Sequence, residues 1–336
     1  MELSSATLQT ASDTLRQWAL DEDLKARVMA NPALSAAAGR IARRYTAGPD
    51  ADRALEALDA AAHRGHRGSI ECVGESVRDA EVADRETQVF VELAQRLGTR
   101  SVDAGQAVDP EQAVDAGQAS ATISFDLSHL GSLVSPELGF ANASRVAQAA
   151  RDAGTSVMIS AEGSGRTDLV LDLWERLSRD FPETGVTLQA RLHRTPDDLE
   201  RVLSRPGPVR LVKGAFHEPA SLAHARDSEP LNVAYHQLAD RLIASGHRLN
   251  LATHDAALIG ELRDRHGDAL RQQHLEFEML QGLGTELLDS LRSDGFVTRE
   301  YVVYGPEWWL YVLNRIAEHP ERALLALADL AGPPTA

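Results

Sequence analysis

The chain has little of what several classes of protein need. Cys72 is the only cysteine in 336 residues, so no disulfide can form within the chain. It has 34 Lys and Arg against 50 Asp and Glu, which gives a formal net charge of −16. Binding to nucleic acid takes clustered Lys and Arg, so this acidic excess argues against a nucleic-acid partner. The acidic residues are spread along the chain, which is typical of a solvated surface.

Long apolar segments are also missing. The N-terminus has no basic stretch followed by an apolar one, so we expect no signal peptide. No apolar run approaches the roughly 20 residues that a membrane helix needs, so we expect no integral membrane segment. Together with the single cysteine, these features favour a cytoplasmic protein. The 43% of hydrophobic residues is ample for a core.

The first part of the chain has the pattern of helices. Apolar residues recur at helical spacing over residues 5–30 and again over 49–65. We expect a helical N-terminal segment over residues 1–62, a main domain over 63–325 and a C-terminal tail over 326–336. Residues 101–120 contain the hexapeptide VDAGQA twice, which predicts an exposed, mobile insertion in the main domain.

From residue 68 onward, β-like and helix-like segments alternate. Each of eight β-like runs precedes a helix-like run, and the β-like runs are 68–77, 121–128, 156–163, 185–192, 208–216, 248–255, 274–282 and 296–305. Repeated βα units over about 250 residues predict an α/β protein with a (β/α)8 TIM-type barrel and a helical N-terminal extension. A doubly wound sheet is the alternative, but "EGSGRTDL" and "QGLGTELL" lack the third glycine of its phosphate-binding fingerprint.

In such a barrel the working residues lie at the carboxyl ends of the strands. We expect polar side chains to gather there from every strand, which indicates an enzyme. They are Glu75, Ser76, Asp126, Ser128, Ser160, Glu162, Gln189, Arg191, Arg210, Lys213, Thr253, His254, Asp255, Glu276, Glu278, Arg299, Tyr301 and Tyr304.

Asp126 stands out because it interrupts an apolar run in "ATISFDLS". A carboxylate is rare in a buried strand unless it is paired or has a function. The residues leave two interpretations open: a structural ion pair, with Lys213 or Arg315 as partner, and a pocket residue.

Seven stretches in order point to one family. They are "ECVGESV", "ISAEGSGRTD", "TLQARLHRTPDDLERV", "VRLVKGAF", "LATHD", "EFEMLQGLG" and "YVVYGPEWWLYVLNRIAEHPE". From about residue 55 to 325 the chain resembles the proline dehydrogenase family, the FAD-dependent barrel that also occurs within the proline utilisation proteins. The resemblance implies FAD as the cofactor. We expect no metal site, because "HRGHRG" (63–68) has no second cluster of ligands at matching spacing.

The resemblance also implies roles for particular residues around the cofactor. Arg210 matches the arginine beside the reactive N5 edge of the flavin, and Gln189 matches the residue that hydrogen-bonds the pyrimidine edge. Further matches to cofactor-binding positions are Lys213, Thr253, His254 and Glu318. A structural pairing of Arg210 or Lys213 with Glu162, Glu276 or Glu278 is the alternative interpretation of these two cations.

At the substrate positions the chain departs from the family. Where the family has two consecutive arginines that bind the substrate carboxylate, this chain has Asn314 and Arg315, so one of the two guanidinium groups remains. Asp126 stands in place of a lysine, Ser160 in place of an aspartate and Phe216 in place of a tyrosine. Tyr301 and Leu280 match the tyrosine and leucine of the family's pocket. The changed charges predict a pocket less suited to an α-carboxylate and more suited to a cationic group.

The sequence therefore predicts a flavoenzyme that oxidises a carbon–nitrogen or hydrazine-type bond of a small amino, imino or hydrazino acid, other than L-proline, in specialised metabolism. Asp126, Arg210, Tyr301 and Arg315 are the expected catalytic residues, and the electron acceptor is a quinone, oxygen or another carrier. Two alternatives are a Schiff-base lyase or aldolase that uses Lys213, and a catalytically silent barrel that binds flavin or another ligand.

Overall fold

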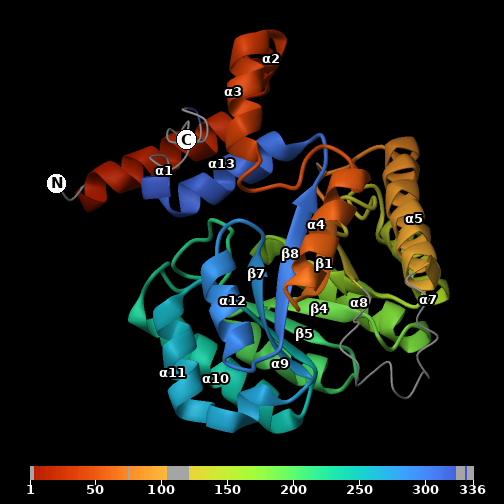
Figure 1. Ribbon diagram of the computed structural model, residues 1–336, viewed down its shortest axis with the longest axis vertical. Coiled ribbons are helices and arrows are strands. Elements are labelled where there is room, and N and C mark those ends of the chain that lie inside the picture. The colour runs from red at the N-terminus through yellow and green to blue at the C-terminus, as the bar shows by residue number, and fades with distance from the viewer. Residues whose placement is uncertain (1–3, 75, 104–120, 323–329, 331–336) are drawn as a thin grey trace.

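Eight parallel strands close into a barrel in chain order, and the last strand pairs with the first (Figure 1). The computed structural model describes residues 4–74, 76–103, 121–322 and 330. The predicted (β/α)8 barrel is confirmed, and the doubly wound alternative is wrong. The strands are β1 (Arg67–Cys72), β2 (Thr122–Phe125), β3 (Ser156–Ile159), β4 (Gly185–Gln189), β5 (Val209–Val212), β6 (Leu249–Ala252), β7 (Leu275–Leu280) and β8 (Thr298–Tyr304).

A helix follows each strand. The helices are α5 (Ala80–Asp103), α7 (Pro136–Asp152), α8 (Thr167–Asp180), α9 (Thr195–Leu203), α10 (Glu229–Ser245), α11 (Ala256–His266), α12 (Thr285–Ser293) and α13 (Trp308–Glu318). These helices cover the outside of the barrel except for the last, α13, which lies beside α1 (Ser5–Ala19) (Figure 1). Three short 3-10 helices accompany them: η1 (Ser164–Arg166), η2 (Gly267–Arg271) and η3 (Pro320–Arg322). Ser135 begins α7 by accepting a hydrogen bond from the Leu138 amide, and Asp255 begins α11 in the same way through the Leu258 amide.

Alternation along the strands sorts the side chains by polarity. Ile70, Phe125 and Leu211 belong to one large buried cluster with apolar side chains of the surrounding helices. The residues between them, such as Ser69, Ser124 and Arg210, reach one another across the inside of the barrel. Barrel interiors are usually filled by branched apolar residues, so this barrel differs in having polar side chains at its centre.

At the amino ends of the strands, an ion-pair network replaces part of the apolar filling. Arg299 Nε lies 2.6 Å from Glu276 Oε2, and Arg67 Nη1 lies 2.6 Å from Glu276 Oε1. The expectation that Glu276 and Arg299 lie at the carboxyl ends is wrong, because each is the second residue of its strand. This network lies at the amino ends of the strands, remote from the barrel mouth, so we assign it a structural role.

The N-terminal helices are α1 (Ser5–Ala19), α2 (Glu22–Ala30), α3 (Pro32–Ala42) and α4 (Ala51–His63). Figure 1 shows α2 and α3 extending away from the barrel, while α1 lies beside α13. Ser12 Oγ donates to the Ala317 carbonyl at 2.7 Å, and Trp309 Nε1 donates to the Trp18 carbonyl at 2.9 Å. This N-terminal part therefore holds the helix that carries Arg315 and Glu318.

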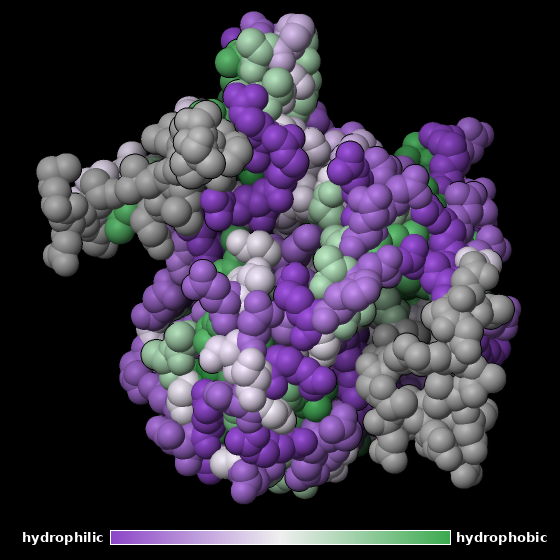
Figure 2. All heavy atoms as spheres, viewed as in Figure 1, coloured by the Kyte–Doolittle hydropathy of each residue, from purple (hydrophilic) through white to green (hydrophobic). Residues whose placement is uncertain are grey.

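Helix α4 packs against β1 and β8 and buries Leu55 and Leu58 in the main core. The face seen in Figure 2 is mostly hydrophilic, with paler and hydrophobic residues over the extended α2–α3 end, where Leu34 is 51% exposed. No helix of the described residues is long and apolar enough to cross a membrane. The VDAGQA duplication and most of the 326–336 tail lie outside the described residues.

Candidate functional site

A buried ion pair lies at the centre of the barrel. Arg210 on β5 donates from Nε to Glu278 Oε2 at 2.7 Å and from Nη2 to Glu278 Oε1 at 2.9 Å. Glu278 also accepts hydrogen bonds from Ser69 Oγ and Asn250 Nδ2, which leaves its carboxylate fully engaged. The positive Arg210 holds the pKa of Glu278 below its usual value despite the opposing effect of burial. The expected structural pairing of Arg210 with a glutamate is therefore present.

Above this pair, Tyr301 and Glu71 continue the polar interior toward the carboxyl ends. The Tyr301 ring lies 4.5 Å from the Arg210 guanidinium carbon, and its hydroxyl donates to Glu71 Oε2. Burial raises the pKa of Glu71, although Tyr301 and the charge of Arg210 oppose that rise. Sequence reasoning missed Glu71, but the alternation of polar residues at 67, 69 and 71 along β1 could have identified it.

Asp126 follows β2 directly and is half-buried. Burial raises its pKa well above the usual value, and the negative charges of Glu71 and Glu162 raise it further. The positive charges of Arg166 and Arg315 act in the opposite direction. No donor among the described residues hydrogen-bonds its carboxylate, so neither of the two expected ion pairs of Asp126 is formed.

The two cations named as partners of Asp126 bind other carboxylates. Lys213 Nζ lies 2.6 Å from Asp255 Oδ2. Arg315 Nη1 donates to both oxygens of Glu318 at 2.9 Å, one turn further along α13. Arg315 Nε is buried without a partner among the described atoms, so one edge of this guanidinium is free to bind an acceptor.

Four more predicted residues lie at the carboxyl ends of the strands. Gln189 ends β4 and donates to the Glu162 carbonyl at 2.9 Å, while its Oε1 is buried without a described partner. Thr253 and His254 follow β6, and Ser160 follows β3. His254 Nε2 accepts from the Leu280 amide at 3.3 Å, and Nδ1 is buried without a described partner. Burial, assisted by nearby arginines, lowers the pKa of His254 to about 3.

The remaining predicted residues are placed around the same mouth with different exposure. Leu280 ends β7, and Asn314 is half-buried on α13 beside Arg315. Phe216 lies on the loop after β5 and is 41% exposed, so its ring is not enclosed by the described residues. The structure thus brings the residues at the strand ends close to α13. Phe216 is more exposed than a residue that lines an enclosed pocket.

Arg16, Arg191 and Arg315 lie around Arg226 near Glu318. Sequence reasoning identified Arg191 and Arg315 but missed Arg16 and Arg226. Burial lowers the pKa of Arg226 to about 10, with Arg16, Arg191 and Arg315 adding repulsion and Glu318 opposing it. Arg191 donates to the carbonyls of Phe216 and His224, which fixes the loop after β5. Arg191 Nε and Arg226 Nη2 are buried without described partners. Such a surplus of buried donors is suited to an anion.

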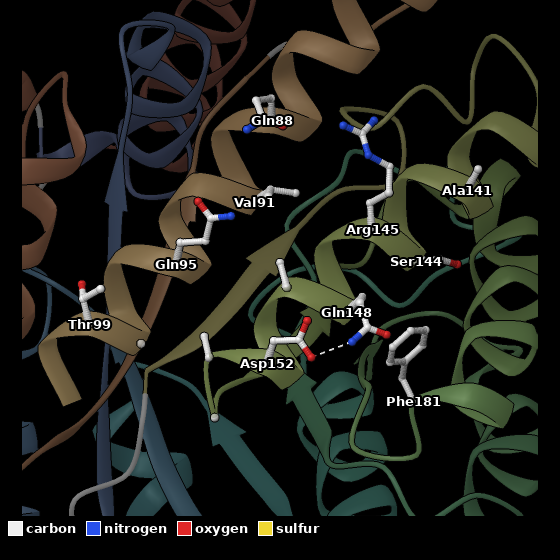
Figure 3. Close-up of a pocket in the computed structure, with 14 residues that line it drawn as sticks. Gln88, Val91, Gln95, Thr99, Ala141, Ser144, Arg145, Gln148, Asp152 and Phe181 are labelled. Atoms are coloured by element: carbon white, nitrogen blue, oxygen red, sulfur yellow. Dashed lines mark hydrogen bonds between the residues drawn. The ribbon is translucent and has the colours of Figure 1, made fainter. Parts of the chain in front are cut away.

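A separate groove lies on the outside of the barrel between α5 and α7 (Figure 3). Its lining includes Gln95, Arg145 and Asp152, and the Gln148 side chain donates to Asp152 at 2.6 Å. None of the predicted site residues lines it. We therefore place the candidate site at the barrel mouth and not in this groove.

Comparisons with known proteins identify relatives of this chain. Proline dehydrogenase from Deinococcus radiodurans is 27% identical over 302 residues, covering 86% of this chain and 90% of its own length. Proline dehydrogenase 1 from Bacillus subtilis is 26% identical over 290 residues, with the same coverage. The structure of proline utilization A from Bdellovibrio bacteriovorus, inactivated by N-propargylglycine, superposes with a TM-score of 0.74 at 19% identity. That match covers 86% of this chain but 34% of the other, and it supports the fold.

The family model described as proline dehydrogenase matches residues 54–315, which is most of the chain. The resemblance seen in the seven motifs is therefore confirmed. The chain belongs to the proline dehydrogenase family and is an FAD-dependent oxidoreductase that acts on a CH–NH group.

Proposed function

We propose that this protein oxidises the carbon–nitrogen bond of a small amino, imino or hydrazino acid other than L-proline, with FAD bound at the barrel mouth. The observation that carries the proposal is the Asp126 carboxyl, which has no described hydrogen-bond donor and lies among charged residues of the mouth. In family members this position is a lysine. A substitution that reverses the charge there changes which substrate group is bound favourably.

Several groups at the mouth fit FAD. The pyrophosphate of FAD is an anion, and Arg191 and Arg226 each have a buried nitrogen without a described acceptor. Gln189 Oε1 and His254 Nδ1 are likewise buried and available to polar edges of the cofactor. Gly214 has φ of +110°, and a Cβ there would lie 2.8 Å from the Arg191 side chain, so glycine at this position lets Arg191 keep its place beside the proposed cofactor site.

When bound, FAD accepts the hydride that leaves the carbon next to the substrate nitrogen. Arg210 supports this chemistry as a fixed positive charge, because Glu278, Ser69 and Tyr301 hold its guanidinium in place. Arg210 Nη1 has no described hydrogen-bond acceptor. It is thus available to stabilise negative charge that develops during the reaction.

Arg315 is proposed to bind the substrate carboxylate through its free Nε edge, since Nη1 is already held by Glu318. Only one arginine remains for this purpose, because Asn314 occupies the neighbouring position. Asp126 is proposed to face the nitrogen-bearing group, Leu280 and Tyr301 to pack against the substrate, and Ser160 and Phe216 to alter the shape of the pocket. These changes disfavour L-proline relative to a substrate with more donor groups.

The alternative of a Schiff-base lyase or aldolase is less well supported. Schiff-base formation needs a neutral amine as nucleophile. Lys213 Nζ instead lies in an ion pair with Asp255 at 2.6 Å. Borohydride trapping of Lys213 in protein without flavin would favour that alternative.

The experiment that tests the proposal is anaerobic bleaching of the bound flavin by a panel of amines, cyclic amino acids and hydrazino acids. We expect a yellow protein whose flavin is bleached by at least one nitrogen compound and slowly by L-proline. A colourless protein contradicts the cofactor assignment. Turnover of L-proline comparable to that of a proline dehydrogenase contradicts the assignment of substrate, and a flavin that no compound bleaches favours a silent barrel.

A further inference from the structure

Glu71 lies between two residues assigned to the proposed active site, although no role follows for it from the family resemblance. On one side, β1 pairs with β8 and Tyr301 donates its hydroxyl hydrogen to Glu71. On the other side, β1 pairs with β2 with Glu71 opposite Ser124, and Asp126 comes two residues after Ser124. Side chains two residues apart along a strand point to the same side. Asp126 comes directly after the end of β2, and the charge of Glu71 acts on its carboxyl, so we place the two carboxyls near each other at the barrel mouth.

We propose that Glu71 and Asp126 act as a pair of carboxyl groups that binds the protonated nitrogen of the substrate and accepts its proton, with Glu71 ionised and Asp126 protonated before the substrate enters. This inference rests on the proposed function and deepens it. It makes Glu71 a catalytic residue and identifies the substrate as an amine that enters the site as a cation.

The balance of charge at the mouth supports this assignment. Arg210 is neutralised by Glu278, Lys213 by Asp255 and Arg315 by Glu318. Glu162 is neutralised by Arg166, whose Nε lies 2.5 Å from Oε2. Among the described residues, Glu71 and Asp126 have no ion-pair partner, and a cation between them would balance their charge. Glu218, on the loop after β5, also forms no ion pair, but it accepts hydrogen bonds from the amide and hydroxyl of Ser164.

The surroundings of the two carboxyls decide which one is ionised. Glu71 faces the Tyr301 hydroxyl on β8 and the positive charges of Arg210, Arg315 and His129, all of which favour its carboxylate. Asp126 faces the carboxylates of Glu71 and Glu162, and only Arg166 and Arg315 counter them. The negative charge of Glu71 adds to the effect of burial in raising the pKa of Asp126, so we place the proton of the pair on Asp126.

The proton and electron balance of the step is complete. The substrate ammonium gives one proton to the Glu71 carboxylate, and its nitrogen recovers a lone pair. The neighbouring carbon then transfers its hydrogen with both bonding electrons to FAD, the oxidant that the family activity supplies. A carbon–nitrogen double bond would form, and the product would leave as a protonated imine (iminium), because the nitrogen loses only the one proton that Glu71 accepts. Asp126 keeps its proton throughout and donates a hydrogen bond within the pair.

The test measures binding of two probes to the flavin-loaded protein, followed through the absorbance spectrum of the bound flavin. Pyrrolidinium carries the cation without a carboxylate, and cyclopentanecarboxylate carries the carboxylate without a nitrogen. The variants are Glu71→Gln and Asp126→Asn, with Glu92→Gln, an exposed glutamate on α5, as the matched control. Cyclopentanecarboxylate reports on folding and on the Arg315 side of the pocket.

We expect Glu71→Gln to weaken pyrrolidinium binding at least about thirtyfold, because a carboxylate partner of a cation is lost. Asp126→Asn should change it less than about threefold at neutral pH, since an amide replaces a protonated carboxyl. All variants should bind cyclopentanecarboxylate as the wild type does. Wild-type affinity for pyrrolidinium should fall about tenfold per pH unit once the pH drops below the raised pKa of Glu71, and this dependence should vanish in Glu71→Gln.

Three results would overturn the inference: wild-type protein that does not bind pyrrolidinium, a Glu71→Gln variant that binds it as tightly as wild type, or Asp126→Asn as damaging as Glu71→Gln. Failure of the proposed function is a different result, in which pyrrolidinium binds as described but no amine in the panel bleaches the flavin.

Discussion

Arg210 and Glu278 form a two-point ion pair inside the barrel, with Nε–Oε2 and Nη2–Oε1 distances of 2.7 and 2.9 Å. The pair joins β5 to β7 across a buried interior, and Ser69 and Asn250 complete the hydrogen bonds of the carboxylate. These hydrogen bonds hold the positive charge of Arg210 in place, and a charge fixed in advance needs little reorganisation when negative charge develops nearby.

Glu278→Ala should destabilise the fold by about 3–5 kcal/mol, because it leaves the Arg210 guanidinium buried without its counter-charge. The measurement is the free energy of unfolding from urea denaturation. Glu183→Ala is the control, since its partner Arg248 is 45% exposed and a surface pair contributes about 1 kcal/mol or less. Equal losses in the two variants would show that the central pair does not stabilise the barrel.

Asp126→Lys should abolish flavin bleaching by the true substrate, with a fall of at least about a hundredfold, and leave FAD bound. The substitution places a cation where the proposed substrate nitrogen lies, and like charges repel. Flavin content and anaerobic reduction rate are the two measurements. Loss of flavin together with activity would instead make Asp126 a structural or cofactor-binding residue.

Gly214→Ala should lower the fraction of protein that retains FAD. A Cβ at this position would lie 2.8 Å from Arg191 Cγ and Cδ, and φ is +110° there, so both space and backbone conformation oppose a side chain. Gly165→Ala is the matched control, because nothing lies within 4 Å of its added Cβ and its φ is unremarkable for an L residue. The absorbance ratio of flavin to protein measures the outcome, and an unchanged ratio for Gly214→Ala would contradict the placement of FAD beside this loop.

L-Proline should bleach the flavin at least about a hundredfold more slowly than the best amine of the panel. The single Arg315, the acidic Asp126 and the missing aspartate at Ser160 each remove an interaction that the family's pocket provides. Anaerobic single-turnover reduction at saturating substrate measures this ratio. A ratio near one would mean that other residues restore the proline pocket.

The sequence predicts the barrel well because its signal is repeated. Each βα unit shows an apolar strand followed by an amphipathic helix, so an error in one unit does not change the fold. The ends of the strands were harder to predict, and Glu276 and Arg299 lie at the amino ends and not at the carboxyl ends. Polar residues on the inner face recur at every second position along a strand, so a short run does not show where the strand begins. Thus the pattern of polar residues shows which side chains face the barrel interior, but not how far each lies from the amino ends of the strands.

The sequence also predicted some of the candidate site residues and missed others. Gln189, Arg210, Lys213, Thr253 and His254 lie within or just after strands, and the strand pattern alone brings them to one mouth. Glu71 and Arg226 were missed for different reasons. Glu71 lies within a strand, and its importance comes from Tyr301, 230 residues away in sequence. Arg226 lies on an irregular loop, whose path the sequence pattern does not specify.

The burial of His254 should make the free energy of unfolding depend on pH in the acidic range. The pKa of His254 is about 3 in the folded protein, mainly because of burial and then because of Arg322, Arg315 and His319, against 6.5 for an exposed histidine. Between these two values the unfolded chain binds a proton that the folded protein does not, so stability falls as the pH falls from 6.5 toward 3. The loss from this group is at most about 1.4 kcal/mol per pH unit. Urea denaturation of wild type and His254→Asn at several pH values isolates it, because asparagine does not titrate. The variant should lose less stability than wild type over this range, and parallel curves for the two proteins would show that the imidazole is free to take up a proton in the folded state.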